Sequence, residues 1–148
     1  MDVTASLAAP CPPAALFALV EDLAVYPRWL DLVHRAEREA DDATAWRVDL
    51  RARLGPLARS KRLRMARRDH DPAAGRVRFE RQELDGRRHA PWVLTATVAP
   101  DDDGSILTMH LHYGGKLWTG GVLERVLNDQ IQQGRNRLLA LVGAQPTH

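Results

Sequence analysis

Residues 46–54 read Trp-Arg-Val-Asp-Leu-Arg-Ala-Arg-Leu, so apolar and charged side chains alternate along the whole stretch. Successive side chains of a β-strand point to opposite faces of the sheet. The alternation therefore predicts a strand with one buried face and one solvated face. A period of two recurs between residues 33 and 113, in the stretches 62–65, 76–80, 92–98 and 107–113.

Clusters of turn-forming residues separate these predicted strands. They are Gly-Pro at 55–56, Asp-Pro-Ala-Ala-Gly at 71–75, Asp-Gly at 85–86 and Asp-Asp-Asp-Gly at 101–104. Glycine, proline and aspartate accept turn dihedral angles or bond their own backbone. Connections this short imply antiparallel neighbours, because parallel strands need a long crossover. The sequence therefore predicts an antiparallel sheet and excludes parallel crossovers as the general plan.

Helical patterns flank the predicted sheet. Residues 2–9 alternate loosely and predict a first strand, which Pro10 ends because proline lacks the amide hydrogen of a ladder. Residues 12–20 begin with prolines and then repeat apolar side chains, which predicts a short helix, and a second short helical segment ends near residues 26–30. A long amphipathic helix from about Leu117 to Val142 is the one predicted element able to cover the apolar face of the sheet.

Size and composition fit a single globular α+β domain over residues 1–148. Hydrophobic residues make up 45% of the chain, yet no stretch approaches the roughly 20 unbroken apolar residues that span a bilayer. We therefore expect no stable membrane insertion. The first residues include Asp2 and lack the basic start and unbroken apolar run of an export signal, and Cys11 is the single cysteine. These features predict a cytoplasmic location.

Three parts of the sequence together match the pattern of a known superfamily. They are residues 12–30 with Glu21-Asp22 and Tyr26-Pro27-Arg28-Trp29, the turn at 67–75 with Asp71-Pro72, and the C-terminal helix. With them the chain resembles the START-like (SRPBCC) superfamily of polyketide cyclases and lipid-transport proteins over essentially its whole length. The resemblance implies a helix-grip fold, in which a curved antiparallel sheet of about seven strands wraps around a long C-terminal helix. Two short helices follow the first strand.

The resemblance also implies a cavity between the sheet and the C-terminal helix. We predict that the cavity binds a hydrophobic or amphipathic small molecule, lipid-like or polyketide-like, without a cofactor. The alternative is a polyketide aromatase/cyclase or dehydratase that acts in the same cavity. A less favoured function is binding of RNA or another anionic partner through the arginine-rich residues 51–68. We expect no nucleic acid partner, because the nearby aromatic residue, Trp46, falls in the buried phase.

The buried phase of the predicted strands is rich in aromatic and flexible apolar side chains, which line apolar sites well. Gly134 falls on or near the apolar stripe of the long helix, where a missing side chain leaves room. The predicted ligand-binding residues are Trp29, Trp46, Leu50, Met65, Phe79, Trp92, Met109, Tyr113, Trp118 and Gly134. From the residues alone, the aromatic side chains equally fit a filled core, and Gly134 equally fits close packing of the helix.

Arg67 and Arg81 continue the buried phase of their strands. A guanidinium group at the end of an apolar pocket can anchor a carboxylate or enolate oxygen of a ligand. Together with Tyr113, these arginines are the candidate catalytic residues, because such a group can polarise a carbonyl during ring closure. Alternatively, both arginines lie at strand ends and simply reach water.

The sequence contains little other catalytic chemistry. Ser6, Ser60 and Ser105 lie outside a nucleophile motif, and no glycine-rich phosphate loop is present. His110 and His112 share one face of a predicted strand, but this face is opposite the apolar side chains, so we predict no metal site. The outer face of the predicted sheet mixes small polar and apolar side chains, so it can stay in contact with water or pair with a second copy. The protein is therefore expected to be a monomer or a homodimer.

Overall fold

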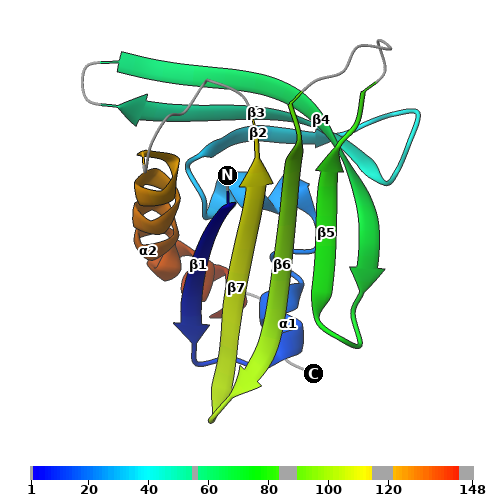
Figure 1. Cartoon of the computed structure of the whole chain (residues 1–148). Helices are drawn as coiled ribbons and strands as arrows, with labels where there is room; N and C mark the ends of the chain where they lie inside the picture. The colour runs from blue at the N-terminus through cyan, green and yellow to red at the C-terminus, as the bar shows by residue number, and fades with distance from the viewer. Residues whose placement is uncertain (1, 55–56, 84–89, 115–121, 144–148) are drawn as a thin grey trace.

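Figure 1 shows the computed structural model, which describes residues 2–54, 57–83, 90–114 and 122–143. Its strands form one antiparallel sheet in the order β1-β7-β6-β5-β4-β3-β2. Two short helices follow the first strand, and a long helix follows the last. The elements are β1 (Asp2–Ala9), α1 (Pro13–Phe17), the 3₁₀-helix η1 (Leu23–Arg28), β2 (Val33–Arg38), β3 (Ala45–Leu54), β4 (Leu57–Asp71), β5 (Arg76–Arg81), β6 (Trp92–Asp101), β7 (Gly104–Tyr113) and α2 (Val122–Gly143).

The strands follow a simple path across the sheet. Strands β2 to β7 are neighbours in chain order, and β1 then pairs with the free side of β7. The register places Asp2 opposite His112 and Ala9 opposite Ser105. The predicted α+β architecture is confirmed: an antiparallel seven-stranded sheet, two short helices after the first strand, and a long C-terminal helix.

A bend in β4 gives the sheet its concave face. This strand has 15 residues, and its pairing with β5 shifts register between Arg67 and Asp69. An extra residue of this kind bends a strand and increases its twist. In Figure 1, β4 crosses the top of the molecule and then turns downward beside β5. The core lies on the concave side that this bend creates.

Alternate residues of the strands point into the core. All eight residues of β1 alternate between exposed and buried, and β7 buries every second residue from Ser105 to Tyr113. In β3, Trp46, Val48 and Leu50 are buried. The phase predicted for residues 46–50 is confirmed, whereas the side chains of residues 52–54 lie outside the described part of the chain.

Two of the predicted turns require unusual backbone angles. Gly75, in the turn between β4 and β5, has a φ of +69°, and Asp102, between β6 and β7, has a φ of 49°. Glycine adopts this left-handed region freely, and aspartate adopts it more readily than most residues. The turns at 71–75 and 101–104 are thus confirmed. Those predicted at 55–56 and 85–86 lie outside the described residues.

Asp22 fixes the start of η1. Its Oδ1 accepts a hydrogen bond from the backbone amide of Ala24 at 2.9 Å, which caps the first turn of the helix. The same oxygen accepts a hydrogen bond from Nε1 of Trp46 at 3.0 Å, and Oδ2 accepts one from Arg38 at 3.3 Å. One carboxylate therefore ties η1 to both β2 and β3.

The helix α2 packs on the core through an apolar stripe. Leu127, Ile131 and Leu138 are buried at the spacing of one helix face. Gly134 lies on the same stripe, and a Cβ atom there would overlap the carbonyl oxygen of Trp29. The helix therefore approaches the backbone of Trp29 very closely. The predicted start of this helix near Leu117 lies outside the described residues.

Replacing Gly134 with alanine should destabilise the protein by about 1–3 kcal/mol, the usual cost of overpacking. The reason is that the added methyl group pushes α2 away from Trp29. Gly143→Ala is the matched control in the same helix, because no described residue lies within 4 Å of its Cβ position. That variant should be as stable as the parent or up to about 1 kcal/mol more stable. Urea unfolding measures both, and equal effects would contradict the tight contact.

Candidate ligand-binding cavity

An apolar cavity lies between the concave face of the sheet, η1 and α2. Its volume is about 50 Å³, counted as space for the centres of water-sized molecules. One water needs about 10–15 Å³ on that scale, so the cavity has room for a few waters and a larger ligand must push its walls apart. The lining residues are Leu23, Tyr26, Leu30, Leu32, Val33, Val48, Leu50, Leu63, Met65, Trp92, Leu94, Met109, Leu111 and Leu127.

Four residues predicted from the sequence lie in this wall. Leu50 and Met65 come from β3 and β4, and Trp92 and Met109 come from β6 and β7. All four sit in the buried phase of their strands, as the period of two predicts. Tyr26 was missed, because it lies on the 3₁₀-helix η1, where the strand period gives no information.

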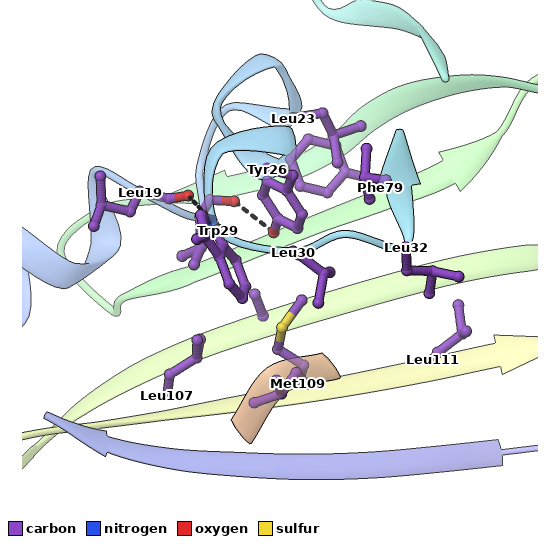
Figure 2. Close-up of a cluster of buried hydrophobic side chains, with 14 of the residues drawn as sticks. Leu19, Leu23, Tyr26, Trp29, Leu30, Leu32, Phe79, Leu107, Met109 and Leu111 are labelled. Atoms are coloured by element: carbon purple, nitrogen blue, oxygen red, sulfur yellow. Dashed lines mark hydrogen bonds between the residues drawn. The ribbon is translucent and has the colours of Figure 1, made fainter. Parts of the chain in front are cut away.

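Three other predicted aromatic residues belong to a packed cluster rather than to the cavity wall. The rings of Trp46 and Phe79 meet edge to face at 5.5 Å, and Phe79 also meets Tyr26 at 6.4 Å. Tyr26 and Trp29 lie 5.2 Å apart, and Nε1 of Trp29 donates a hydrogen bond to the Leu19 carbonyl (Figure 2). This cluster holds η1 against the sheet.

Tyr26 connects the cluster to the cavity. It is fully buried, and its hydroxyl donates a hydrogen bond to the Val20 carbonyl at 2.9 Å (Figure 2). Burial, with a smaller contribution from the negative charge of Asp22, raises the pKa of Tyr26 far above its usual value. The phenol therefore stays neutral, and its hydroxyl proton points to the Val20 carbonyl. Tyr26 contributes an apolar ring to the wall rather than an acid or a base.

The remaining predicted ligand-binding residues lie in different places. Tyr113 is buried, and its ring packs against Trp92 at 5.6 Å. At Gly134, the space left by the missing side chain is taken by the main chain of Trp29. Trp118 lies outside the described residues.

Arg67 is held outside the cavity. Its Nη1 donates a hydrogen bond to the Glu21 carbonyl at 3.0 Å, and its guanidinium carbon lies 5.4 Å from the centre of the Trp46 ring. A cation over an aromatic face is attracted to the ring electrons. Arg67 therefore stabilises the segment just before η1, through the Glu21 carbonyl.

Arg81 and Lys61 lie together near Trp92. Arg81 donates a hydrogen bond to the Ala90 carbonyl at 3.3 Å, and Nζ of Lys61 lies 5.9 Å from the centre of the Trp92 ring. Desolvation first, and then the positive charge of Arg81, lower the pKa of Lys61. In the sequence Lys61 belongs to the basic stretch expected on the outer face, although it shares the inward phase of Leu63 and Met65.

Two basic side chains on the outer face of β4, Arg62 and Arg64, are paired with carboxylates. Nε of Arg62 donates a hydrogen bond to Asp49 at 2.9 Å, and Nη1 of Arg64 donates one to Glu39 at 3.0 Å. Both carboxylates come from the neighbouring part of the chain around β2 and β3. Part of the charge in the arginine-rich stretch is thus neutralised within the fold.

His110 and His112 project from the outer face of β7, as predicted from their phase. Nε2 of His110 and Nδ1 of His112 each lie 3.0 Å from Oδ1 of Asp2 on β1. The hydrogen bond with His112 is the main cause that lowers the pKa of Asp2. The two histidines therefore serve as partners of a carboxylate on the solvated side of the sheet.

Comparisons with known proteins identify the same fold. A family model described as polyketide cyclase / dehydrase and lipid transport matches residues 1–143. A solved structure from Thermus thermophilus has a TM-score of 0.69 and 19% identity, and the match covers 99% of this chain and 100% of that chain. None of the curated proteins matches the sequence.

Two further structures carry descriptive titles. A START superfamily protein from Mycobacterium smegmatis has a TM-score of 0.68 and 17% identity, with 96% of this chain and 97% of that chain covered. The di-domain ARO/CYC BexL from the BE-7585A biosynthetic pathway has a TM-score of 0.63 and 16% identity, with 97% of this chain and 46% of BexL covered. At these identities the similarity shows the fold alone, and the helix-grip fold implied by the sequence is confirmed. Within the described residues, no helix combines the length and hydropathy that crossing a membrane requires.

Arg81→Gln should raise the pKa of Lys61 toward its usual value. Removing the neighbouring positive charge favours the protonated amine, whereas the desolvation of Lys61 remains. An NMR pH titration of the Lys61 side-chain signals measures the change. Arg62→Gln is the control, because Arg62 points to the opposite face and bonds Asp49. If the pKa of Lys61 is unchanged or lower in Arg81→Gln, the two charges do not interact as described.

Proposed function

This chain belongs to the polyketide cyclase/dehydrase and lipid transport family, and from that premise we propose that it binds a hydrophobic or amphipathic small molecule between its sheet and α2. Residues 1–148 act as one ligand-binding domain in this proposal. The ligand is lipid-like or polyketide-like, because the family includes proteins that act on both classes.

The observation that carries this proposal is the unfilled apolar cavity. Protein interiors are packed as densely as organic crystals, and few voids exceed the size of a water molecule. A void lined by leucine, methionine and aromatic side chains forfeits dispersion contacts and gives water no partners. An apolar molecule that enters restores those contacts. Met65 and Met109 are flexible enough to let the wall adapt to a larger guest.

The alternative, a polyketide aromatase/cyclase or dehydratase, has less support. Arg67 is bonded to the Glu21 carbonyl, and Arg81 and Tyr113 do not line the cavity. The hydroxyl of Tyr26, which does line it, donates to the Val20 carbonyl. Among the described wall residues, none presents an acid or a base to the space. Binding of RNA also has less support, because Arg62 and Arg64 are paired with carboxylates.

Leu50→Trp should weaken binding of an apolar ligand at this cavity. The larger side chain occupies the space of about 50 Å³ that Leu50 helps to line. The neutral probe N-phenyl-1-naphthylamine, followed by its fluorescence, is expected to bind the parent protein and to lose at least about tenfold in affinity, or about 1.4 kcal/mol, in the variant.

Arg51→Trp is the matched control for this substitution. It adds the same side chain at the next position of β3, on the exposed face. Its probe affinity should equal that of the parent, and thermal unfolding should show that both variants are folded. Equal affinity in the two variants would place the probe elsewhere and contradict the proposal.

Native mass spectrometry of the freshly purified protein tests the same function without a chosen probe. We expect a mass above that of the bare chain, and denaturing extraction should release an apolar or amphipathic compound that identifies the ligand class. A bare mass together with no uptake of the probe would favour a filled core and a role at the protein surface.

A further inference from the structure

Trp92 carries a buried hydrogen-bond donor with no acceptor among the described residues. The residue is 4% exposed and its ring forms part of the cavity wall, and its Nε1 has no hydrogen-bond partner in the part of the chain that the structure describes. Buried donors are nearly always paired, because a donor that has lost its hydrogen bond to water and gains no other acceptor destabilises the fold. The other two described tryptophans follow that rule, because Nε1 of Trp29 bonds the Leu19 carbonyl and Nε1 of Trp46 bonds Asp22.

Two positive charges lie near the same ring. Nζ of Lys61 is 5.9 Å from the centre of the Trp92 ring, and the charge of Arg81 acts on Lys61 strongly enough to help lower its pKa. Among the described residues, no carboxylate lies within 4 Å of either group. Arg62 and Arg64, which alternate with Lys61 on the other face of β4, each have such a partner.

Strand direction brings these groups to one end of the sheet. The end of β5 lies between β4 and the start of β6, and Arg81 faces Met65 in the middle of β4. Lys61 precedes Met65 by four residues, and its Nζ lies 5.9 Å from the centre of the Trp92 ring. Lys61 lies in the first part of β4, Arg81 is the last residue of β5, and Trp92 is the first residue of β6. Partly buried like charges destabilise one another unless an opposite charge joins them. The cavity wall beyond Trp92 is apolar. Its residues next to Lys61 are Leu50, which pairs with Lys61 across β3 and β4, and Leu63, two residues further along β4.

We propose that the ligand is an amphipathic anion whose headgroup binds between Lys61, Arg81 and the indole N–H of Trp92 while its apolar body enters the cavity. The inference rests on the proposed function and specifies the ligand's charge. Carboxylate and phosphate oxygens share the required chemistry, since both accept hydrogen bonds and carry negative charge. The anion supplies the missing acceptor for Trp92 and the missing counter-charge for the two cations.

Three ligands with the same apolar body test the headgroup. Decanoate, decyl phosphate and neutral decanol are titrated into the full chain by isothermal calorimetry. At least one anion should bind about tenfold more tightly than decanol, the factor expected for one charge-assisted hydrogen bond. Tighter binding of decanoate assigns a carboxylate, and tighter binding of decyl phosphate assigns a phosphate. Equal affinity of all three overturns the anionic site and leaves the proposed function standing, whereas no binding of any of them or of N-phenyl-1-naphthylamine overturns both.

Single substitutions locate the headgroup. Lys61→Gln, Arg81→Gln and Trp92→Phe should each weaken binding of the preferred anion about tenfold and leave binding of decanol unchanged. Trp92→Phe keeps an aromatic ring but removes the N–H group. Arg62→Gln, on the outer face of the same strand, should change neither affinity. Equal losses for anion and decanol in the three variants would mean that they merely disturb the cavity, and the inference would fail.

The indole signal of Trp92 gives a direct readout. In a ¹H–¹⁵N NMR spectrum, assigned with Trp92→Phe, the Nε1–H proton should move downfield when the anion binds, because it gains an acceptor. Decanol should leave its position nearly unchanged. A Trp92 signal that responds identically to both ligands would contradict a headgroup at this end of the cavity.

Discussion

The contact between Gly134 and the carbonyl oxygen of Trp29 sets the distance between α2 and the rest of the core. Glycine is costly inside a helix, so its presence on the buried stripe needs a compensating contact. The compensation is that main chain packs directly on main chain, which places the C-terminal end of η1 under the middle of the helix. With this distance fixed, side chains fill one part of the space over the concave face and leave another part open. Around Trp29, Trp46 and Phe79 the space is filled by aromatic rings, whereas a cavity remains between η1, α2 and the strands of the sheet.

The filled side depends on a chain of contacts that starts at Asp22. Its carboxylate caps η1 and accepts the hydrogen bond of Trp46. Trp46 then packs against Phe79, and Phe79 against Tyr26. The rings of Trp46 and Phe79 lie outside the cavity wall, whereas that wall combines leucines, valines and methionines with the rings of Tyr26 and Trp92. Tyr26 belongs to both the aromatic cluster and the cavity wall, so the packing of η1 against Phe79 sets one boundary of the cavity.

The period of the sequence predicted the strands, their buried faces and four wall residues, Leu50, Met65, Trp92 and Met109. It could not separate wall from filled core, because Trp46 and Phe79 share the phase of the wall residues. That distinction depends on how η1 packs, and η1 is set by a cap and a 3₁₀ turn that carry no strand period. For the same reason Tyr26 was missed. Lys61 was in phase with Leu63, but its charge suggested the outer face, and only the fold shows that it faces Trp92.

The polar groups near the cavity favour holding a ligand over transforming it. General acid–base chemistry needs a group that exchanges a proton near the working pH and reaches the reacting atom. Tyr26 is the one titratable residue in the described wall. Burial raises its pKa, so its hydroxyl keeps its proton and donates it in a hydrogen bond to the Val20 carbonyl. The other nearby groups, Lys61, Arg81 and the indole of Trp92, are hydrogen-bond donors. Such donors can orient or polarise a bound oxygen, which is the role that the proposed headgroup site gives them.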